Sequence, residues 1–184
     1  MKTTKKLMFI WLIVMFIITF TCSLTYLVTQ QVLRLDANER PAQLATDTEI
    51  KLQNGRSPIS IISGDTIDIS KSLDTFVMIF DKNHQLVASS GMMNGNQPSY
   101  PRGVLDNTAK KGEVRVTWQP KKGLRFASVA LKTNNGYIVA ARSLYETENL
   151  IDKIGNLVLL AWGAFLLLST GAILIINAFV KRIL

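Results

Sequence analysis

Two long apolar segments enclose a more polar middle in this 184-residue chain. Residues 7–29 and 157–179 each run for 23 residues without a charged side chain. In a helix that rises 1.5 Å per residue, such a segment reaches about 34 Å, enough to cross a hydrocarbon core of about 30 Å. The pattern therefore predicts two transmembrane helices, with one domain formed by residues 30–156 between them.

The first apolar segment has a second interpretation, a cleaved secretory signal, because it follows a basic start. The apolar core of a signal is usually about 7–15 residues long and ends at small residues. The segment here is longer and no such cleavage motif follows it, so the sequence favours an uncleaved anchor.

The middle of the chain alternates between helical and extended patterns. Residues 34–54 predict a helix that continues the first span, with a kink or restart at Pro41 and an end at Gly55. The predicted strands are 76–80 and 85–89 around the turn 81–84, then 113–118, ended by Pro120, then 124–132 and 137–142. Residues 104–111 predict a short helix that Gly112 stops.

This order of elements predicts an α+β domain. We expect a five-stranded antiparallel sheet with helices on one face, its core lying at about residues 69–142. A juxtamembrane helix over 143–156 is expected to run unbroken into the second span. Ser143 and Glu146 have the spacing of a capping box at its start.

The distribution of charge predicts the membrane topology of the chain. The chain has 21 basic and 13 acidic residues, and every acidic residue lies between the two apolar segments. Five basic residues lie in the short tails 1–6 and 180–184, namely Lys2, Lys5, Lys6, Lys181 and Arg182. Positive flanks stay cytoplasmic, so we expect both tails on the cytoplasmic side of the membrane and the domain on the outer side. The middle is then only weakly basic, which argues against nucleic-acid binding.

Four stretches of the middle resemble a known family: FVMIFDKNHQLVASSG (76–91), YPRGVLDNTAKKGEVRVTWQP (100–120), LRFASVAL (124–131) and GYIVAARSLYETENLIDKIGNLVLLAW (136–162). They are similar to the extracytoplasmic PAS-like sensor modules of bacterial two-span membrane proteins, including sensor histidine kinases. The resemblance implies a bacterial cytoplasmic membrane, an external sheet that senses a ligand or condition, and a second span that relays a small movement. The sequence ends at Leu184, where a HAMP linker or kinase would begin, so the resemblance does not extend to kinase activity.

The residue types that catalysis and metal binding need are scarce. His84 is the only histidine and Cys22, in the first apolar segment, the only cysteine, so the usual zinc sets and an internal disulfide are excluded. No nucleotide-binding or hydrolase motif is present. We expect a non-enzymatic protein without a metal or cofactor. A small external hydrolase that uses His84 with nearby Asp81, Ser89 or Ser90 remains the enzymatic alternative.

A small-ligand pocket between sheet and helices is a more credible external site. Its candidate residues are Arg102, Arg115, Arg125 and Arg142, with Trp118 and Tyr137 as apolar walls. Arg125 and Arg142 lie at predicted strand ends, where a guanidinium can bind a carboxylate through two hydrogen bonds. The alternative is that these arginines pair with acidic residues of the chain and that Trp118 belongs to the core.

A heptad pattern marks the second long helix. Leu144, Ile151 and Val158 recur every seven residues, and Thr147, Ile154 and Ala161 follow at an offset of three. We interpret Leu144, Ile151, Ile154 and Val158 as helix-packing residues. They pack either in a homodimer or against the first helix of the same chain.

These patterns lead to a first hypothesis, a membrane sensor or adaptor that signals in trans through its transmembrane helices. Its partners would be membrane lipid together with a sensor kinase, a transporter or a second copy. The alternative is a degenerate sensor fragment or structural envelope protein with no ligand.

Overall fold

The computed structural model describes residues 2–62, 64 and 66–183, and these form two compact units. One unit, here the helical unit, contains the chain up to Val32 and from Asn149 onward. The other, here the sheet unit, contains Leu33–Glu148. Met1 and Leu184, the outer ends of the two expected tails, lie outside the described residues.

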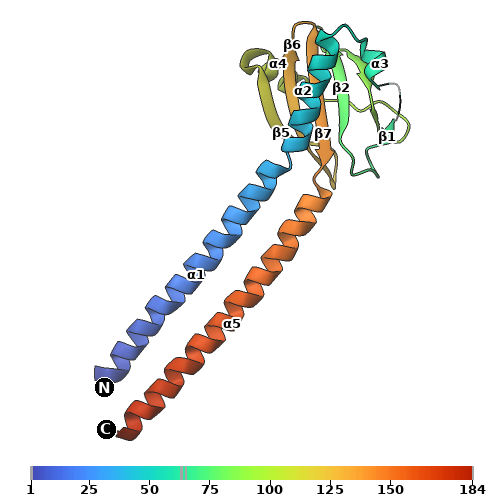
Figure 1. Cartoon of the computed structure of the whole chain (residues 1–184). Helices are drawn as coiled ribbons and strands as arrows, with labels where there is room; N and C mark the ends of the chain where they lie inside the picture. The colour runs from blue at the N-terminus through green and yellow to red at the C-terminus, as the bar shows by residue number, and fades with distance from the viewer. Residues whose placement is uncertain (1, 63, 65, 184) are drawn as a thin grey trace. The chain divides into compact units, whose positions relative to one another are not determined.

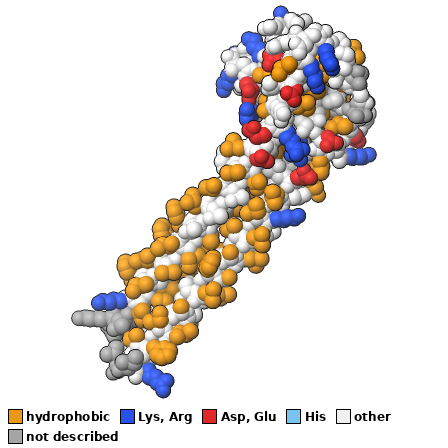
Figure 2. All heavy atoms as spheres, in the orientation of Figure 1, with side chains coloured by type: hydrophobic (Ala, Val, Ile, Leu, Met, Phe, Trp, Pro, Cys, Tyr) orange, Lys and Arg blue, Asp and Glu red, His pale blue; other side chains and the backbone are white. Residues whose placement is uncertain are grey.

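The helical unit is formed from α1 (Lys2–Asp36) and α5 (Tyr145–Ile183). Each helix contains an apolar window long enough to cross a membrane, and none of either window is buried within the protein. Figure 2 shows hydrophobic side chains along the surface of both helices, with charged side chains on the sheet unit and at the helix ends. Two long, exposed apolar helices at the ends of the chain suggest a two-span membrane protein, as the sequence predicted.

The sheet unit has a five-stranded antiparallel sheet, which confirms the predicted α+β class. Its order is β3 (Leu86–Ser89), β2 (Phe76–Asp81), β7 (Gly136–Ser143), β6 (Leu124–Thr133) and β5 (Glu113–Lys121). The helices are α2 (Glu39–Gln53), α3 (Pro58–Ile62) and α4 (Arg102–Lys111). A separate parallel pair is formed by β1 (Ile67–Asp68) and β4 (Gly91–Met92). The sequence did not predict α3, β1 and β4, which are at most five residues long.

Helices cover both faces of the sheet, so the expectation of helices on one face was wrong (Figure 1). On one face, Phe76 and Met78 of β2 belong to a buried cluster with Leu105 of α4. On the other face, Val77 packs in a cluster with Ala45 of α2. The physical reason lies in β2, whose first five residues are all buried. An uninterrupted apolar strand presents side chains to both faces, and each face needs a cover.

The α4 face holds an aromatic core. The ring of Phe126 lies 5.4 Å from those of Phe76 and Trp118, and the Tyr100 ring also lies 5.4 Å from Trp118. The Ser128 hydroxyl donates to the Val116 carbonyl at 3.0 Å. A hydroxyl has one hydrogen, so Tyr100, whose Oη lies 3.0 Å from Ser128 Oγ, must be the donor in that contact. Burial raises the pKa of the Tyr100 phenol.

Several element boundaries differ from the predicted ones. The restart between the first two helices lies at Ala37 and Asn38, and Pro41 sits in the first turn of α2, where a missing N–H costs little. Strand β5 continues through Pro120 because it is an edge strand, with a register shift after Trp118. At the start of α5 the Ser143 hydroxyl accepts the Tyr145 N–H at 3.3 Å. The Glu146 carboxylate binds Arg142, not the Ser143 backbone as a capping box requires.

We predict that Tyr100→Phe lowers the stability of the full-length protein in detergent by about 1 kcal/mol at pH 8, the usual contribution of one hydrogen bond. The folded-state pKa of Tyr100 is raised, so the stabilisation from the neutral phenol is complete below the unfolded pKa of about 10 and is lost above it. The difference between wild type and variant should therefore shrink between pH 8 and pH 11 in thermal unfolding followed by near-ultraviolet circular dichroism. A difference that does not change with pH would contradict the buried neutral phenol.

Candidate functional site

A cavity of about 320 Å³ lies in the sheet unit where β7 passes into α5. It is lined by three segments: a loop after β1, the turn between β5 and β6, and the first residues of α5. The lining residues are Ile69, Ser70, Lys71, Ser72, Leu73, Gly123, Leu124, Arg125, Ser143, Tyr145 and Glu148. Three serine hydroxyls, Arg125 and Glu148 give this cavity polar walls.

The loop of this cavity is shaped by Asp68. Its carboxylate accepts hydrogen bonds from the Ser70 N–H at 3.0 Å and from the Ser70 hydroxyl at 2.6 Å. Its carbonyl accepts the N–H groups of Lys71 and Ser72. The hydrogen bonds from Ser70 lower the pKa of Asp68, and Lys71 adds a smaller effect in the same direction. An aspartate that bonds its own backbone two residues on is typical of a tight turn, so this loop has a defined conformation.

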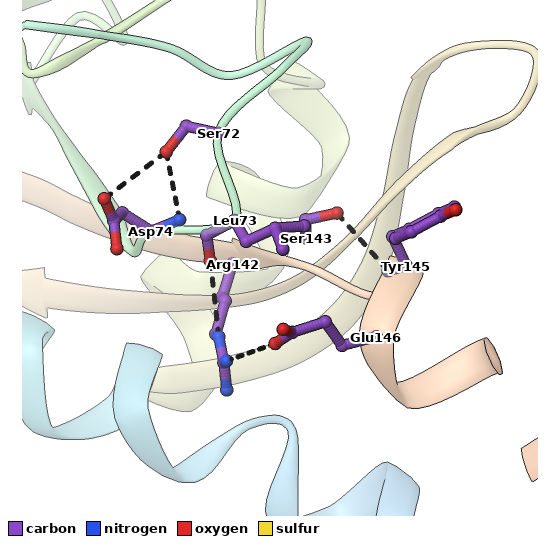
Figure 3. Close-up of polar contacts among 7 residues, drawn as sticks. All are labelled: Ser72, Leu73, Asp74, Arg142, Ser143, Tyr145 and Glu146. Carbon is purple, nitrogen blue, oxygen red and sulfur yellow. Dashed lines mark hydrogen bonds and ion pairs between the residues drawn. The ribbon is translucent and has the colours of Figure 1, made fainter. Parts of the chain in front are cut away.

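Arg142 connects this loop to the start of α5 (Figure 3). Its Nε donates to the Leu73 carbonyl at 3.4 Å, and its Nη2 lies 2.9 Å from Glu146 Oε2. On the far side of Leu73, the Ser72 hydroxyl accepts the Asp74 N–H at 3.1 Å. One side chain at the end of β7 thus holds both the loop and the first turn of α5.

Arg125 makes the second connection to α5. Its Nη1 donates to Glu148 Oε1, and its carbonyl accepts the Leu144 N–H at 2.8 Å. Both side chains of the ion pair are 40% exposed. Glu146 and Glu148 lie in the first turn of α5, where the helix dipole also favours negative charge. The two strand-end arginines therefore bind the two carboxylates at the helix start.

The structure does not place the other predicted ligand residues in this cavity. Trp118 and Tyr137 are buried in the aromatic core of the α4 face, 5% and 8% exposed. Arg102 is exposed at the first position of α4. Arg115 pairs with Glu113, which raises the pKa of the guanidinium, and also lies 3.7 Å from Glu39. Of the predicted set, Arg125 lines the cavity and Arg142 holds its loop.

The predicted helix-packing residues are largely covered within one chain. Leu144 is buried with Ala37 and Ala127 in a small cluster of the sheet unit. Ile151 is buried, and Ile154 and Val158 are half-buried. Leu144 and Ile151 are therefore covered within one chain, whereas Ile154 and Val158 keep part of their surface free.

The residues of the hydrolase alternative are engaged in other contacts. His84 has a left-handed backbone with φ of 61°, and its Nδ1 lies 3.7 Å from Asp106 Oδ1. The Ser89 hydroxyl donates to the Gly91 carbonyl at 2.7 Å, and that of Ser90 accepts the Val77 N–H at 2.9 Å. Within the described residues, no group of three potential metal ligands occurs.

The sequence analysis missed the acidic half of the site, Glu146 and Glu148. Arg142 and Glu146 have the i, i+4 spacing of a helical ion pair, a signal present in the sequence. No local pattern connects Arg125 to Glu148, which is 23 residues away.

Comparison with protein-family models, curated proteins and solved structures found no match.

We predict that Arg142→Gln frees both the loop and the helix start. Amide hydrogen exchange of the full-length protein should become about two- to fivefold faster at residues 72–74 and 145–148, as expected for a partly exposed ion pair. Arg115→Gln is the matched control, because it also removes a paired arginine but does not contact the loop. Equal exchange in the two variants at these residues would show that Arg142 does not hold them.

Proposed function

We propose that the sheet unit is an extracytoplasmic sensor of a small carboxylate ligand and that it acts on a partner protein through α1 and α5. One observation carries this proposal: two strand-end arginines bind the first turn of α5 beside a cavity of about 320 Å³. That volume lies at the small end of the usual range for ligand pockets, about 300–1,000 Å³. A guanidinium at such a cavity is well suited to bind a carboxylate.

The ligand would compete with an internal carboxylate. Arg125 binds Glu148 at the cavity wall, so a ligand that takes Arg125 would release Glu148. Partly exposed ion pairs contribute about 0.2–1 kcal/mol, so a ligand of modest affinity is enough to replace one. Because Glu148 belongs to α5, its release would change how the sheet holds the helix that continues to Ile183. The resemblance to PAS-like sensor modules supports the same interpretation, in which a change in the external sheet is relayed to the second span.

The charges at the ends of the helices support an orientation in the membrane, and the surface of α5 supports a partner within it. Basic residues flank both candidate spans on the side away from the sheet unit, which favours cytoplasmic tails and an extracytoplasmic sheet unit in a bacterial cytoplasmic membrane. The apolar surface of α5 is available to a kinase, a transporter or a second copy within the bilayer.

We predict that a small mono- or dicarboxylate raises the melting temperature of the full-length protein in nanodiscs. At a ligand concentration of 100 Kd, binding to the folded state alone adds about 2.7 kcal/mol of stability. Arg125→Gln should remove the shift, and Arg115→Gln should keep it. If no carboxylate in the panel shifts the melting temperature, or if Arg125→Gln leaves a shift intact, the sensor proposal fails and a structural protein without a ligand is favoured.

We predict that α5 contacts a specific partner in the membrane. A photo-crosslinking residue at Leu167, which is 77% exposed, should give one dominant adduct in native membranes. Replacing residues 157–179 by a generic leucine-rich span that carries the same crosslinker should abolish the adduct, and adding the stabilising carboxylate should change its yield. An adduct that survives the replacement, or a yield that ignores the ligand, would contradict signalling through this helix.

A further inference from the structure

A groove of about 760 Å³ lies within the helical unit, between α1 and α5. From α1 it is lined by Thr19, Cys22, Ser23 and Tyr26, and from α5 by Asp152, Gly155, Asn156, Val158, Leu159 and Trp162. The spacings of three, four and seven residues place each set on one helix face. These are the two faces that the helices turn toward each other, whereas their outer faces are apolar.

Side-chain contacts hold the groove at two points. The Trp162 indole N–H donates to the Thr19 hydroxyl at 3.1 Å. Tyr26 packs over Gly155, where a Cβ atom would lie 3.1 Å from the ring carbon Cε2. Gly155 therefore leaves room for the Tyr26 ring, and Trp162 lines the groove at its other end.

The chemistry of the groove changes along its length. Asp152, Asn156, Ser23 and Tyr26 provide a carboxylate, an amide and two hydroxyls at the end nearer the sheet unit in the sequence. Trp162 lies ten residues beyond Asp152, about 15 Å further along the helix. Val158 and Leu159 make the intermediate wall apolar.

Asp152 has no counter-charge in this groove. No basic side chain lines it, and among the described residues none forms an ion pair with Asp152. Asp152 lies five residues before the second apolar segment, and its side chain is exposed. Its carboxylate is therefore accessible to a charged group that enters the groove from the membrane surface. The occupant that complements it carries a positive charge.

We propose that this groove binds the head group of a membrane lipid that carries a primary ammonium, from the leaflet in which the sheet unit joins the two spans. The Asp152 carboxylate accepts hydrogen bonds from the ammonium. The Ser23 hydroxyl and the Asn156 amide donate to the lipid phosphate. Val158 and Leu159 contact the first part of the acyl chains. This inference is independent of the carboxylate site in the sheet unit.

A phospholipid with an ethanolamine head group fits this arrangement better than an anionic lipid does. The ethanolamine group brings an N–H donor to Asp152, whereas a glycerol head group leaves the carboxylate beside a net negative phosphate. A quaternary ammonium has the charge but no N–H to donate. The order of preference expected from the groove is therefore ethanolamine, then choline, then glycerol.

The test is lipid retention by the full-length protein, measured by native mass spectrometry from a neutral detergent. The protein is equilibrated with equal amounts of phosphatidylethanolamine, phosphatidylcholine and phosphatidylglycerol that have identical acyl chains. Wild type should retain phosphatidylethanolamine over phosphatidylglycerol by about tenfold, the ratio expected for one charge-assisted hydrogen bond. Asp152→Asn keeps the size of the side chain and should remove the preference.

Two further variants make the result specific to the groove. Asp36→Asn makes the same charge change at an exposed acid at the end of α1, outside the groove, and should keep the preference. Asn156→Leu leaves the carboxylate in place but removes a phosphate donor, and should lower retention of all three lipids. Equal retention of the three lipids by wild type, or a preference that survives Asp152→Asn, would overturn the proposal. So would a lipid-free dimer that Asp152→Asn dissociates, because a second copy would then occupy the groove.

Discussion

The antiparallel pairing of β2 with β7 is the contact on which the sheet unit depends. These two strands lie 55 or more residues apart in sequence, yet Phe76 pairs with Ala141 and Asp81 with Gly136. Both strands are buried on both faces, so their pairing joins the cover made by α2 to the core made by α4. At Gly136 a Cβ atom would collide with the Phe80 carbonyl, and glycine therefore lets the two strands approach at this end.

The same register positions the candidate site. Because Phe76 lies opposite Ala141, the residues just before β2 lie beside the residues just after Ala141. Arg142 consequently reaches the Leu73 carbonyl on one side and Glu146 on the other. A loop from one part of the chain and a helix start from another are held by one guanidinium. These two segments are distant in sequence but adjacent in space, because β2 pairs with β7 in the middle of the sheet.

The polar contacts at the two sites differ in how easily they can change. In the sheet unit the ion pairs are partly exposed and individually weak, so they suit a reversible response. The two long apolar helices suggest that much of the helical unit lies in a membrane, where a polar group needs a partner in protein or lipid. Thr19 and Trp162 satisfy each other across the helices, whereas Asp152 lacks such a partner among the described residues. The proposed lipid head group would supply a partner for Asp152, whereas the outer helix surfaces are apolar.

The sequence by itself determined the two membrane-length helices, the α+β class, the β5–β6–β7 meander and the turn at Asp81, because these depend on local periodicity and turn chemistry. It also pointed to Arg125 and Arg142 as strand-end residues. Only the tertiary structure decided that α2 and α4 cover opposite faces, that Trp118 and Tyr137 belong to the core, and that Glu148 binds Arg125. Those outcomes depend on which strands pair and in which register, and pairing between distant strands is set by the burial of whole faces, which no local pattern encodes.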